Sequence, residues 1–385
     1  MKKIAIIGRG TAGCLALTHF ARWADKDFNI DLYYDPAIAQ QSVGEGSPLN
    51  LPASLHTNID FNHSDLTYVD GSFKAGIVKT GWGNGVDFTH HFPPPSVGYH
   101  FNAVKLQDYI LNHFKDNRRV QIIQENVGHD VDADFVFDCS GKPDSYEEYN
   151  MSDTIPVNST YITQCYWDYP RFQHTLTLAR PYGWVFGIPL QNRCSIGYMY
   201  NSNTSSLEDV KADVQNVFDE YNLTPSDTTN AFSFKNYSRK QNFTERVAYS
   251  GNASFFLEPL EATSIALMEQ IQRNTFGLWV KAYDVNHANT KYSSQVNELE
   301  NMMALHYYAG SIFNTPFWDM AQEKATKKIE QAMADPKFQQ VILDSKNYKF
   351  GDTGNYLEYG SWWPGSFKVN LENLGLYKKL EKFGV

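Results

Sequence analysis

Hydrophobic residues near the start of the chain occur as one short continuous run, a pattern typical of a strand buried on both faces. The run covers residues 4–7, and a glycine-rich turn and a helix rich in alanine and leucine follow it. A second strand-like run over 28–35 ends at Asp35, and a later one over 133–138 ends at Asp138. This order predicts an α/β fold whose strands share one sheet.

Further along the chain the pattern changes twice. Between about residues 155 and 240, short alternating segments such as TYITQCYWDY and CSIGYMYN are separated by turn residues, which predicts an antiparallel sheet inserted into the first module. Beyond about residue 265 the apolar spacing is mostly helical. We therefore expect a nucleotide-binding module over 1–300 that includes the inserted sheet, and a helical region over 301–385 packed on it.

The glycine-rich turn has the spacing of a dinucleotide-binding fingerprint. Gly8, Gly10 and Gly13 lie between the first strand and the helix, and Asp35 follows Gly13 by 22 residues. Glycines let the backbone approach a pyrophosphate at the helix N-terminus, and an acid at this distance can accept hydrogen bonds from a ribose. The sequence therefore predicts a bound dinucleotide, with Asp138 at the same end of the sheet. The fingerprint alone leaves NAD and FAD both open.

The stretch FLEPLEATSI at 256–265 predicts the start of a helix. Pro259 suits the first helical position, and apolar residues continue with helical spacing. In this interpretation Glu258 lies near the cap, Glu261 lies in the first turn, and the N–H groups around Thr263 and Ser264 are at the positive end of the helix dipole. Such an end can hold an anion. The alternative is that both glutamates merely cap the helix.

Charge and cysteine content narrow the possible functions. The chain has 33 basic and 43 acidic residues and a net charge of −10, which argues against a nucleic-acid partner or a polybasic membrane surface. No apolar run is long enough to span a bilayer, and the four cysteines lie far apart, without metal-ligand spacing. We expect a reduced, cytoplasmic protein with no bound metal. A homo-oligomer is possible, but the composition does not decide the oligomeric state.

Two resemblances carry more specific information. The segment VAYSGNASFFLEPLEATSI resembles the second flavin-binding segment of glutathione-reductase-like flavoproteins, with Asn252 in place of the usual aspartate. Motifs along most of the chain resemble those of the flavin-dependent tryptophan halogenase family. In order, they are GRGTAGC, SVGEGSP, GSFKAGIVKTGW, GWVFGIPL, FLEPLEATSI and LHYYAGSIFNTPFWDM. Phe186 stands where the family has a second tryptophan, and Ser264 stands where it has a glycine.

The resemblance implies a glutathione-reductase-like FAD-binding fold of class α/β, with an inserted antiparallel sheet and a mostly helical C-terminal substrate-binding part. It implies that FAD, reduced by a separate flavin reductase, and O2 convert a halide ion to hypohalous acid, which halogenates a small aromatic substrate such as an indole or phenol. The residues expected to bind FAD are Gly8, Gly10, Thr11, Ala12, Gly13, Asp35, Glu45, Asp138, Asn252 and Leu257. The expected halide site is Thr263 and Ser264.

The lysine of the family matches Lys74, and its acid matches Glu261. A buried ammonium can donate a hydrogen bond to hypohalous acid, or its amine can become a haloamine, and a carboxylate can stabilise or deprotonate the cationic ring that follows electrophilic attack. Lys79 is the competing lysine, but in a regular strand side chains five residues apart face opposite ways. Both lysines can serve one cavity only if the strand is broken. We expect Lys74 to be catalytic, and the spacing leaves open whether it meets Glu261.

Aromatic residues are expected to line the substrate cavity. The candidates are His90, His91, Phe92, Trp184, Phe186, Trp362 and Trp363. The C-terminal region is shorter than in the tryptophan-acting members of the family. We therefore expect several electron-rich arenes to be accepted, with free tryptophan no better than simpler indoles or phenols. Two alternatives stay open: a flavin monooxygenase that hydroxylates its substrate, and a flavin-binding protein without catalysis, which the change at Asn252 would suit.

Overall fold

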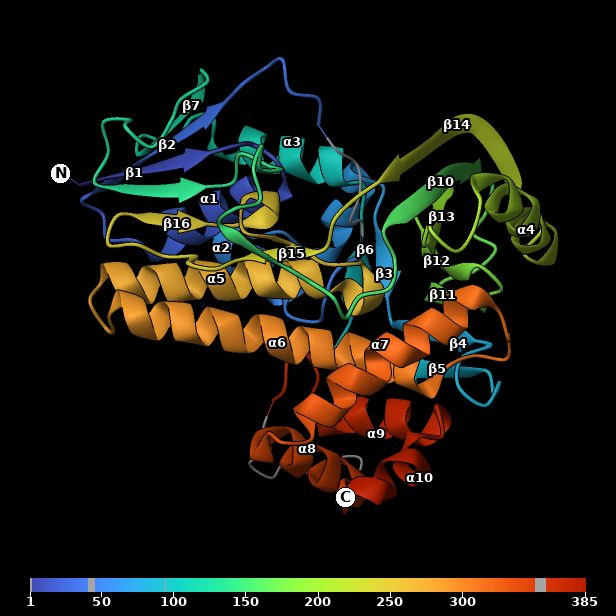
Figure 1. Ribbon diagram of the computed structural model, residues 1–385. Helices are drawn as coiled ribbons and strands as arrows, with labels where there is room; N and C mark the ends of the chain where they lie inside the picture. The colour runs from blue at the N-terminus through green and yellow to red at the C-terminus, as the bar shows by residue number, and fades with distance from the viewer. Residues whose placement is uncertain (1, 41–45, 94, 350–357) are drawn as a thin grey trace. The chain divides into compact units, whose positions relative to one another are not determined.

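Interleaved stretches of the sequence build two structural units. The computed structural model describes residues 2–40, 46–93, 95–349 and 358–385 (Figure 1). Unit 1 consists of Met1–Phe73, Gly98–Met151 and Asn236–Ser294, and unit 2 consists of Lys74–Val97, Ser152–Lys235 and Gln295–Val385. The two regions predicted from the sequence, 1–300 and 301–385, are continuous stretches and do not correspond to these units; that division stays a prediction.

A five-stranded parallel sheet forms the centre of unit 1, in the order β16-β8-β1-β2-β7. Its strands are β1 (Lys2–Ile7), β2 (Phe28–Tyr34), β7 (Val120–Gln124), β8 (Phe135–Asp138) and β16 (Val247–Tyr249). Successive side chains of a strand point to opposite faces. Ile7 therefore joins a hydrophobic cluster with Val136 and Val247 on one face, whereas Ile6 lies beside Gly13 of α1 on the other. The predicted α/β fold is confirmed.

Helices and short strands complete unit 1. The helices are α1 (Thr11–Trp23), α2 (Leu51–Ile59), α3 (Ala103–Phe114) and α5 (Thr263–Trp279), with 3₁₀ turns η1 (His63–Val69), η2 (Gly251–Ala253) and η3 (Leu260–Ala262). Two small sheets pair β3 (Ser72–Lys74) with β6 (Gly98–His100), and β15 (Tyr237–Arg239) with both β9 (Tyr149–Met151) and β17 (Phe255–Phe256). The turn η2 contains Asn252, a predicted flavin-binding residue, and the turn η3 directly precedes Thr263 and Ser264, the predicted halide site.

A seven-stranded sheet forms the centre of unit 2, in the order β14-β10-β13-β12-β11-β4-β5. Its strands are β4 (Gly76–Thr80), β5 (Phe88–His91), β10 (Ser159–Tyr166), β11 (Thr175–Arg180), β12 (Gly183–Pro189), β13 (Arg193–Tyr200) and β14 (Thr224–Ser233). The pairing of β11 with β4 is parallel, and the other pairings are antiparallel. The antiparallel pairing expected within 155–240 is therefore confirmed for β10–β14, and the sheet as a whole is mixed because β4 and β5, from 76–91, join its edge.

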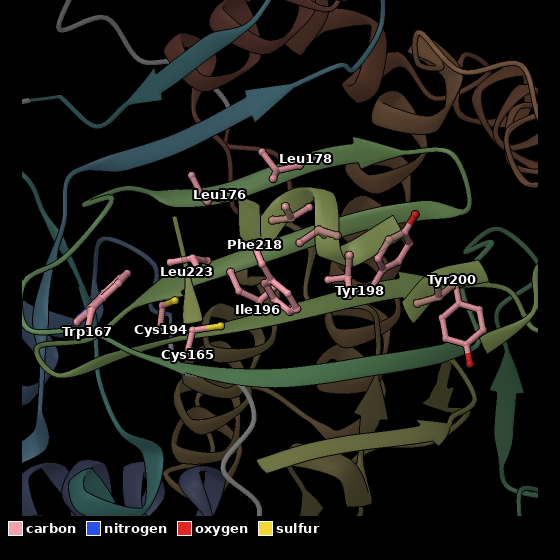
Figure 2. Packing of buried hydrophobic residues seen from close by; sticks show 14 residues of the cluster. Cys165, Trp167, Leu176, Leu178, Cys194, Ile196, Tyr198, Tyr200, Phe218 and Leu223 are labelled. Carbon is pink, nitrogen blue, oxygen red and sulfur yellow. The ribbon is translucent and has the colours of Figure 1, made fainter. Parts of the chain in front are cut away.

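One face of this sheet packs on α4 (Leu207–Glu220). Figure 2 shows the hydrophobic cluster, in which Ile196 and Tyr198 of β13 lie with Phe218 of α4. Val210 and Val214 belong to the same cluster, and their spacing in the sequence places them on one face of the helix. The cluster also includes residues of β10, β11 and β12, and Val78 of β4 packs against it, so α4 covers this face of the sheet.

Helices predominate in the C-terminal part of the chain, as expected. Helix α6 (Val285–Ala309) begins in unit 1 and ends in unit 2, and the later helices of unit 2 are α7 (Pro316–Ala332), α8 (Pro336–Asn347), α9 (Pro364–Asn373) and α10 (Leu376–Leu380), followed by the 3₁₀ turn η4 (Glu381–Phe383). Each of α7, α8 and α9 begins with a proline, where the missing N–H is no loss. Among the described helices, none is both long enough and apolar enough to cross a membrane.

Candidate active site

The turn between β1 and α1 depends on close backbone packing. At Gly8, where φ is +105°, an added Cβ would lie 2.2 Å from the Cys139 carbonyl oxygen, and at Gly13 it would lie 1.9 Å from the Gly8 carbonyl oxygen. At Gly10, the residue before α1, an added Cβ would meet nothing within 4 Å, and no side chain in the described part of the chain caps the helix. The start of α1 therefore combines open space with uncapped N–H groups, which suits a pyrophosphate.

The two acids predicted near the nucleotide follow β2 and end β8. Asp35 accepts a hydrogen bond from the Ala37 N–H at 2.8 Å. Asp138 is buried, and its carboxylate lies 2.7 Å from His129 Nε2 and accepts from the Ser140 N–H at 2.8 Å. Burial alone would raise the pKa of Asp138, but the hydrogen bonds from His129 and Ser140 outweigh it and hold the pKa below its ordinary value. Asp138 therefore fixes the end of β8, and its contact with a nucleotide stays a prediction.

Two tyrosine hydroxyls hold the backbone of the turn η2. Tyr237 Oη donates to the Asn252 carbonyl oxygen at 2.8 Å, and Tyr149 Oη donates to the Ala253 carbonyl oxygen at 2.8 Å. Burial raises the pKa of both tyrosines, so the hydroxyls stay protonated and remain donors. Neither tyrosine could be predicted from the sequence, because no motif marks a tyrosine that supports a turn from a distant strand.

The turn η2 packs against the glycine-rich turn. Gly251 has φ +58°, and an added Cβ would lie 2.8 Å from the Ala12 Cβ. Leu257, further along the same segment, is buried, and the Thr11 hydroxyl accepts a hydrogen bond from a side chain of α3 at 3.1 Å. The structure therefore brings together the two segments in which flavin-binding residues are predicted. Glu45, another predicted flavin residue, lies outside the described residues.

The backbone just before α5 is left-handed at two successive residues. Glu261 has φ 67° and ψ 14°, and Ala262 has φ 56° and ψ 32°, a conformation that costs roughly 1–2 kcal/mol for a residue with a Cβ. A right-handed helix cannot include such residues, so α5 begins at Thr263 and the predicted start at Pro259 is wrong. Glu261 consequently lies just before the first turn of α5, and Glu258 is fully buried.

This change of hand makes the start of α5 suitable for a small anion. Left-handed Ala262 is followed by right-handed Thr263, at φ −63° and ψ −25°, and such a pair turns successive N–H groups into one concavity. The N–H groups of Thr263 and Ser264 belong to the first helical turn, where no intrahelical acceptor exists for them. Thr263 is 1% exposed, and its hydroxyl oxygen has no hydrogen bond to the described residues. The serine at 264 offers the same backbone N–H as the expected glycine.

Lys74 and Lys79 of unit 2 are both buried, with 2% and 0% of the residue exposed. The strand predicted to run through both is broken at Ala75, between β3 and β4. The two lysines therefore do not lie on one regular strand, and their side chains need not face opposite sides. Lys74 Nζ lies 5.8 Å from the centroid of the Phe92 ring, and Lys79 Nζ lies 2.7 Å from His306 Nε2.

Three of the predicted cavity residues, Phe92, His90 and Trp362, lie next to one another and are called the aromatic row. The ring centroids of His90 and Phe92 are 5.8 Å apart, and those of His90 and Trp362 are 6.3 Å apart, both in edge-to-face geometry. His90 Nε2 lies 3.1 Å from the Ser366 hydroxyl of α9, which fixes the imidazole. The ammonium of Lys74 lies over the Phe92 end of the row.

The other predicted cavity residues lie elsewhere in unit 2. Trp184 is buried on β12, and its ring centroid is 6.3 Å from that of Phe186. His91 is exposed and faces the side of β5 opposite to the aromatic row. Trp363 stands edge-on to the Tyr348 ring, with the centroids 5.2 Å apart. The predicted roles of these four residues in a substrate cavity stay predictions.

Comparison with known proteins identifies the family. A sequence profile described as tryptophan halogenase matches residues 3–122 and 112–353 of this chain. The chain belongs to the tryptophan halogenase family. It is 22% identical over 392 residues to tryptophan 7-halogenase RebH of Lentzea aerocolonigenes, a match that covers 94% of this chain and 68% of that protein. It is 21% identical over 318 residues to tryptophan 6-halogenase ThaL of Streptomyces albogriseolus, a match that covers 72% of this chain and 59% of that protein.

Solved structures of the family share the fold over almost the whole chain. The tryptophan 6-halogenase SttH of Streptomyces toxytricini has a TM-score of 0.77 at 18% identity, and the match covers 98% of this chain and 90% of that one. MibH, a tryptophan 5-halogenase, has a TM-score of 0.78 at 15% identity, covering 98% of this chain and 86% of that one. The predicted fold class is therefore confirmed.

Membership makes the chain one of the flavin-dependent halogenases, an oxidoreductase-type enzyme family whose cofactor is FAD. Unit 1 fits that cofactor, because the start of α1 is uncapped and open at Gly10 and because the turn at Gly251 packs on Ala12 beside it. The residues that would hold FAD are therefore those of the two turns, together with Asp35 after β2. Individual contacts to the cofactor stay predictions.

Proposed function

We propose that this chain uses reduced FAD and O2 to make hypohalous acid and transfers the halogen, as an electrophile, to a small electron-rich arene. The observation that carries the proposal is the burial of Lys74, which is 2% exposed and lies over the Phe92 ring. Lysine is almost never fully buried unless its ammonium is paired, so a buried ammonium beside an aromatic ring is an unusual feature that catalysis would explain. Chloride, bromide and iodide are all candidate halides.

The halide is held by the N–H groups of Thr263 and Ser264 at the start of α5. Bound and reduced, FAD would supply two electrons to O2, so that one oxygen atom leaves as water and the other takes two electrons from the halide to form hypohalous acid. The left-handed backbone of Glu261 and Ala262 fixes the directions of the two N–H groups before the halide arrives. A preoriented site of this kind needs no reorganisation when the charge enters it.

Lys74 handles the hypohalous acid. Its ammonium donates a hydrogen bond to the oxygen of HOX, which polarises the O–X bond and makes the halogen electrophilic. As the arene carbon takes the halogen, the O–X bond breaks, and the proton of Lys74 goes to the departing oxygen to make water. Burial strengthens this hydrogen bond because bulk water does not screen it.

Glu261 completes the substitution. The attacked ring is a cation that carries one proton more than the product, and a carboxylate can stabilise that charge and accept the proton. The reaction then balances as arene and HOX giving haloarene and water, with Lys74 and Glu261 returned to their starting states by proton exchange. That both residues act on one substrate molecule stays a prediction, and Glu258, which is fully buried, has no assigned step.

The aromatic row supports an arene as the substrate. Phe92 is half-buried and lies beside the ammonium of Lys74, and the buried rings of His90 and Trp362 pack edge-on next to it; flat rings bind aromatic surfaces by burial and stacking. Indoles and phenols, which have nucleophilic carbons, suit an electrophilic halogen. In this proposal a separate flavin reductase supplies reduced FAD. The cytoplasmic location and the lack of a bound metal stay predictions.

The test is a product survey with the full chain, FAD, a flavin reductase, NADH and O2, in which each halide is combined with a panel of indoles, phenols and free tryptophan. Mass spectrometry should find products in which one hydrogen is replaced by the halogen, from several arenes, and only when halide is present. Oxygen insertion without halide would support the monooxygenase alternative. Strict selectivity for one carbon of free tryptophan would contradict the expected breadth of substrates.

A further inference from the structure

Lys79 is a second buried lysine, and the proposed mechanism does not use it. It is 0% exposed and lies on β4, five residues after Lys74. In the antiparallel register of β4 and β5, Lys79 pairs with Phe88 and Ile77 pairs with His90. Directly opposed side chains lie on the same face of a sheet, and so do residues two apart in one strand. Lys79 therefore faces the same side of the sheet as His90, a member of the aromatic row.

The ammonium of Lys79 contacts three other parts of unit 2. It lies 2.7 Å from His306 Nε2 of α6, donates to Asn370 Oδ1 of α9, and lies 5.5 Å from the centroid of the Trp362 ring. His306 Nδ1 lies 3.0 Å from the Met302 carbonyl oxygen, which can only accept. The hydrogen of His306 is therefore on Nδ1. Nε2 can accept a hydrogen bond from the Lys79 ammonium when the imidazole is neutral.

These contacts reach the aromatic row through Trp362. Its ring centroid is 5.4 Å from that of His306 and 6.3 Å from that of His90. Ser366, on the same helix as Asn370, holds His90 through the contact of 3.1 Å. Lys79 thus lies at the Trp362 end of the row and connects strand β4 to Trp362 and to α9. Lys74 lies at the opposite end of the row, over Phe92.

Filling space does not require a lysine at this position. A buried ammonium loses its hydration, and an apolar side chain of similar length, such as methionine, would fill the same volume without that cost. What methionine cannot supply is the directional bond to His306 and Asn370 or the attraction of a cation to the Trp362 ring. The buried charge of Lys79 is therefore best explained by the orientation that it gives to His306, Asn370 and the Trp362 ring.

We propose that Lys79 is a positioning residue of the arene site: it fixes the Trp362 ring, and through Trp362 the aromatic row, in the orientation that receives the substrate. The inference rests on the proposed function only in taking the aromatic row as the arene-binding surface. It assigns Lys79 no contact with hypohalous acid. Its effect on substrate binding passes through Trp362.

The test is a double-mutant cycle that measures indole binding to the full chain by calorimetry, without halide, flavin reductase or turnover. Lys79→Met should weaken the Kd of indole about tenfold in the wild-type background and less than twofold in a Trp362→Phe background, a coupling of about 1–1.4 kcal/mol. Lys79→Arg, which keeps the charge, should retain most of the affinity. Lys327→Met, at an exposed lysine of the same unit, is the matched control and should leave the Kd unchanged.

Equal losses in the two backgrounds would overturn the inference, since they would mean that Lys79 acts only on general stability. Unchanged binding in Lys79→Met, or no saturable indole binding by the wild-type chain, would overturn it as well. If Lys79→Met does not fold, Asn370→Leu removes one partner of the ammonium and should show the same coupling to Trp362 with a smaller loss. A chain that shows the coupling but makes no haloarene would contradict the proposed function and leave this inference standing.

Discussion

Replacing Ala262 by glycine should make the protein more stable and its use of halide poorer. Ala262 has φ 56° and ψ 32°, and a left-handed residue with a Cβ costs roughly 1–2 kcal/mol. Glycine removes that cost but gives up roughly 0.5–1 kcal/mol of additional backbone entropy on folding. The difference is a gain of about 0.5–1 kcal/mol in the free energy of unfolding. For a chain of this size, whose unfolding entropy is about 0.8 kcal/mol/K, that is a rise in Tm of roughly 0.6–1.2 °C.

The functional effect should have the opposite sign. Glycine adopts positive and negative φ about equally readily, so the N–H groups of Thr263 and Ser264 would no longer be held in one direction before the halide arrives. The KM for halide should rise about three- to tenfold, while kcat at saturating halide changes little, because the variant keeps Lys74 and Glu261.

The assay pairs thermal unfolding with a halide titration of haloarene formation. Ala266→Gly, four residues further along and inside α5, is the matched control, because glycine in a helix interior costs roughly 1 kcal/mol and should lower the Tm. Ala262→Val should also lower it, since a β-branched residue tolerates the left-handed region poorly. A fall in Tm for Ala262→Gly equal to that of Ala266→Gly would refute the left-handed backbone, and an unchanged halide KM would refute its role.

Three further predictions concern other parts of the molecule. Glu261→Gln keeps the shape and removes the charge, so kcat should fall by about 10²-fold or more, while Glu258→Gln should have a smaller effect; equal mild losses in a steady-state assay would favour purely structural roles. Gly8→Ala should abolish FAD binding, measured by flavin fluorescence, because the added Cβ would lie 2.2 Å from a carbonyl oxygen. Gly10→Ala should still fold, because nothing lies within 4 Å of its added Cβ, and it should weaken FAD binding only through contact of that Cβ with the cofactor. Equal loss of FAD binding in the two variants would contradict the packing argument. The lowered pKa of Asp138 stabilises the folded state above the ordinary carboxyl pKa of about 4, and this contribution is lost as the pH falls through the lowered value. Asp138→Asn should therefore lower the Tm more at pH 7 than at acidic pH, and a difference that does not change with pH would contradict this.

Local sequence patterns predicted what depends on local structure. The strand, glycine turn and helix at the N-terminus follow from neighbouring residues, since Gly8 and Gly13 are required by contacts within and next to the same turn. The start of α5 was predicted four residues too early, because Glu261 and Ala262 are ordinary residues in a left-handed conformation that neither residue type suggests. Such a conformation is imposed by the surroundings and is not visible in the sequence.

Features that depend on distant residues could not be predicted. The hairpin of β4 and β5 joins a sheet whose other strands follow much later in the sequence, so a local pattern shows that it is extended but not where it pairs. The burial of Lys79 depends on His306 and Asn370, which are 227 and 291 residues further along the chain. Because a lysine is rarely buried without a partner, its burial can be predicted only when the residues that contact it in the fold are known.

The central claim is that Lys74 activates hypohalous acid for transfer of its halogen to the arene, and one paired measurement tests it. Wild type and Lys74→Met are supplied with reduced FAD, O2, bromide and indole, and the oxidation of the flavin and the yield of bromoindole are followed in the same reaction, with catalase and a scavenger of free hypobromous acid present. The account predicts that flavin oxidation proceeds at the same rate in both proteins while bromoindole falls by about 10²-fold or more in Lys74→Met. Equal yields of bromoindole from the two proteins would contradict the claim.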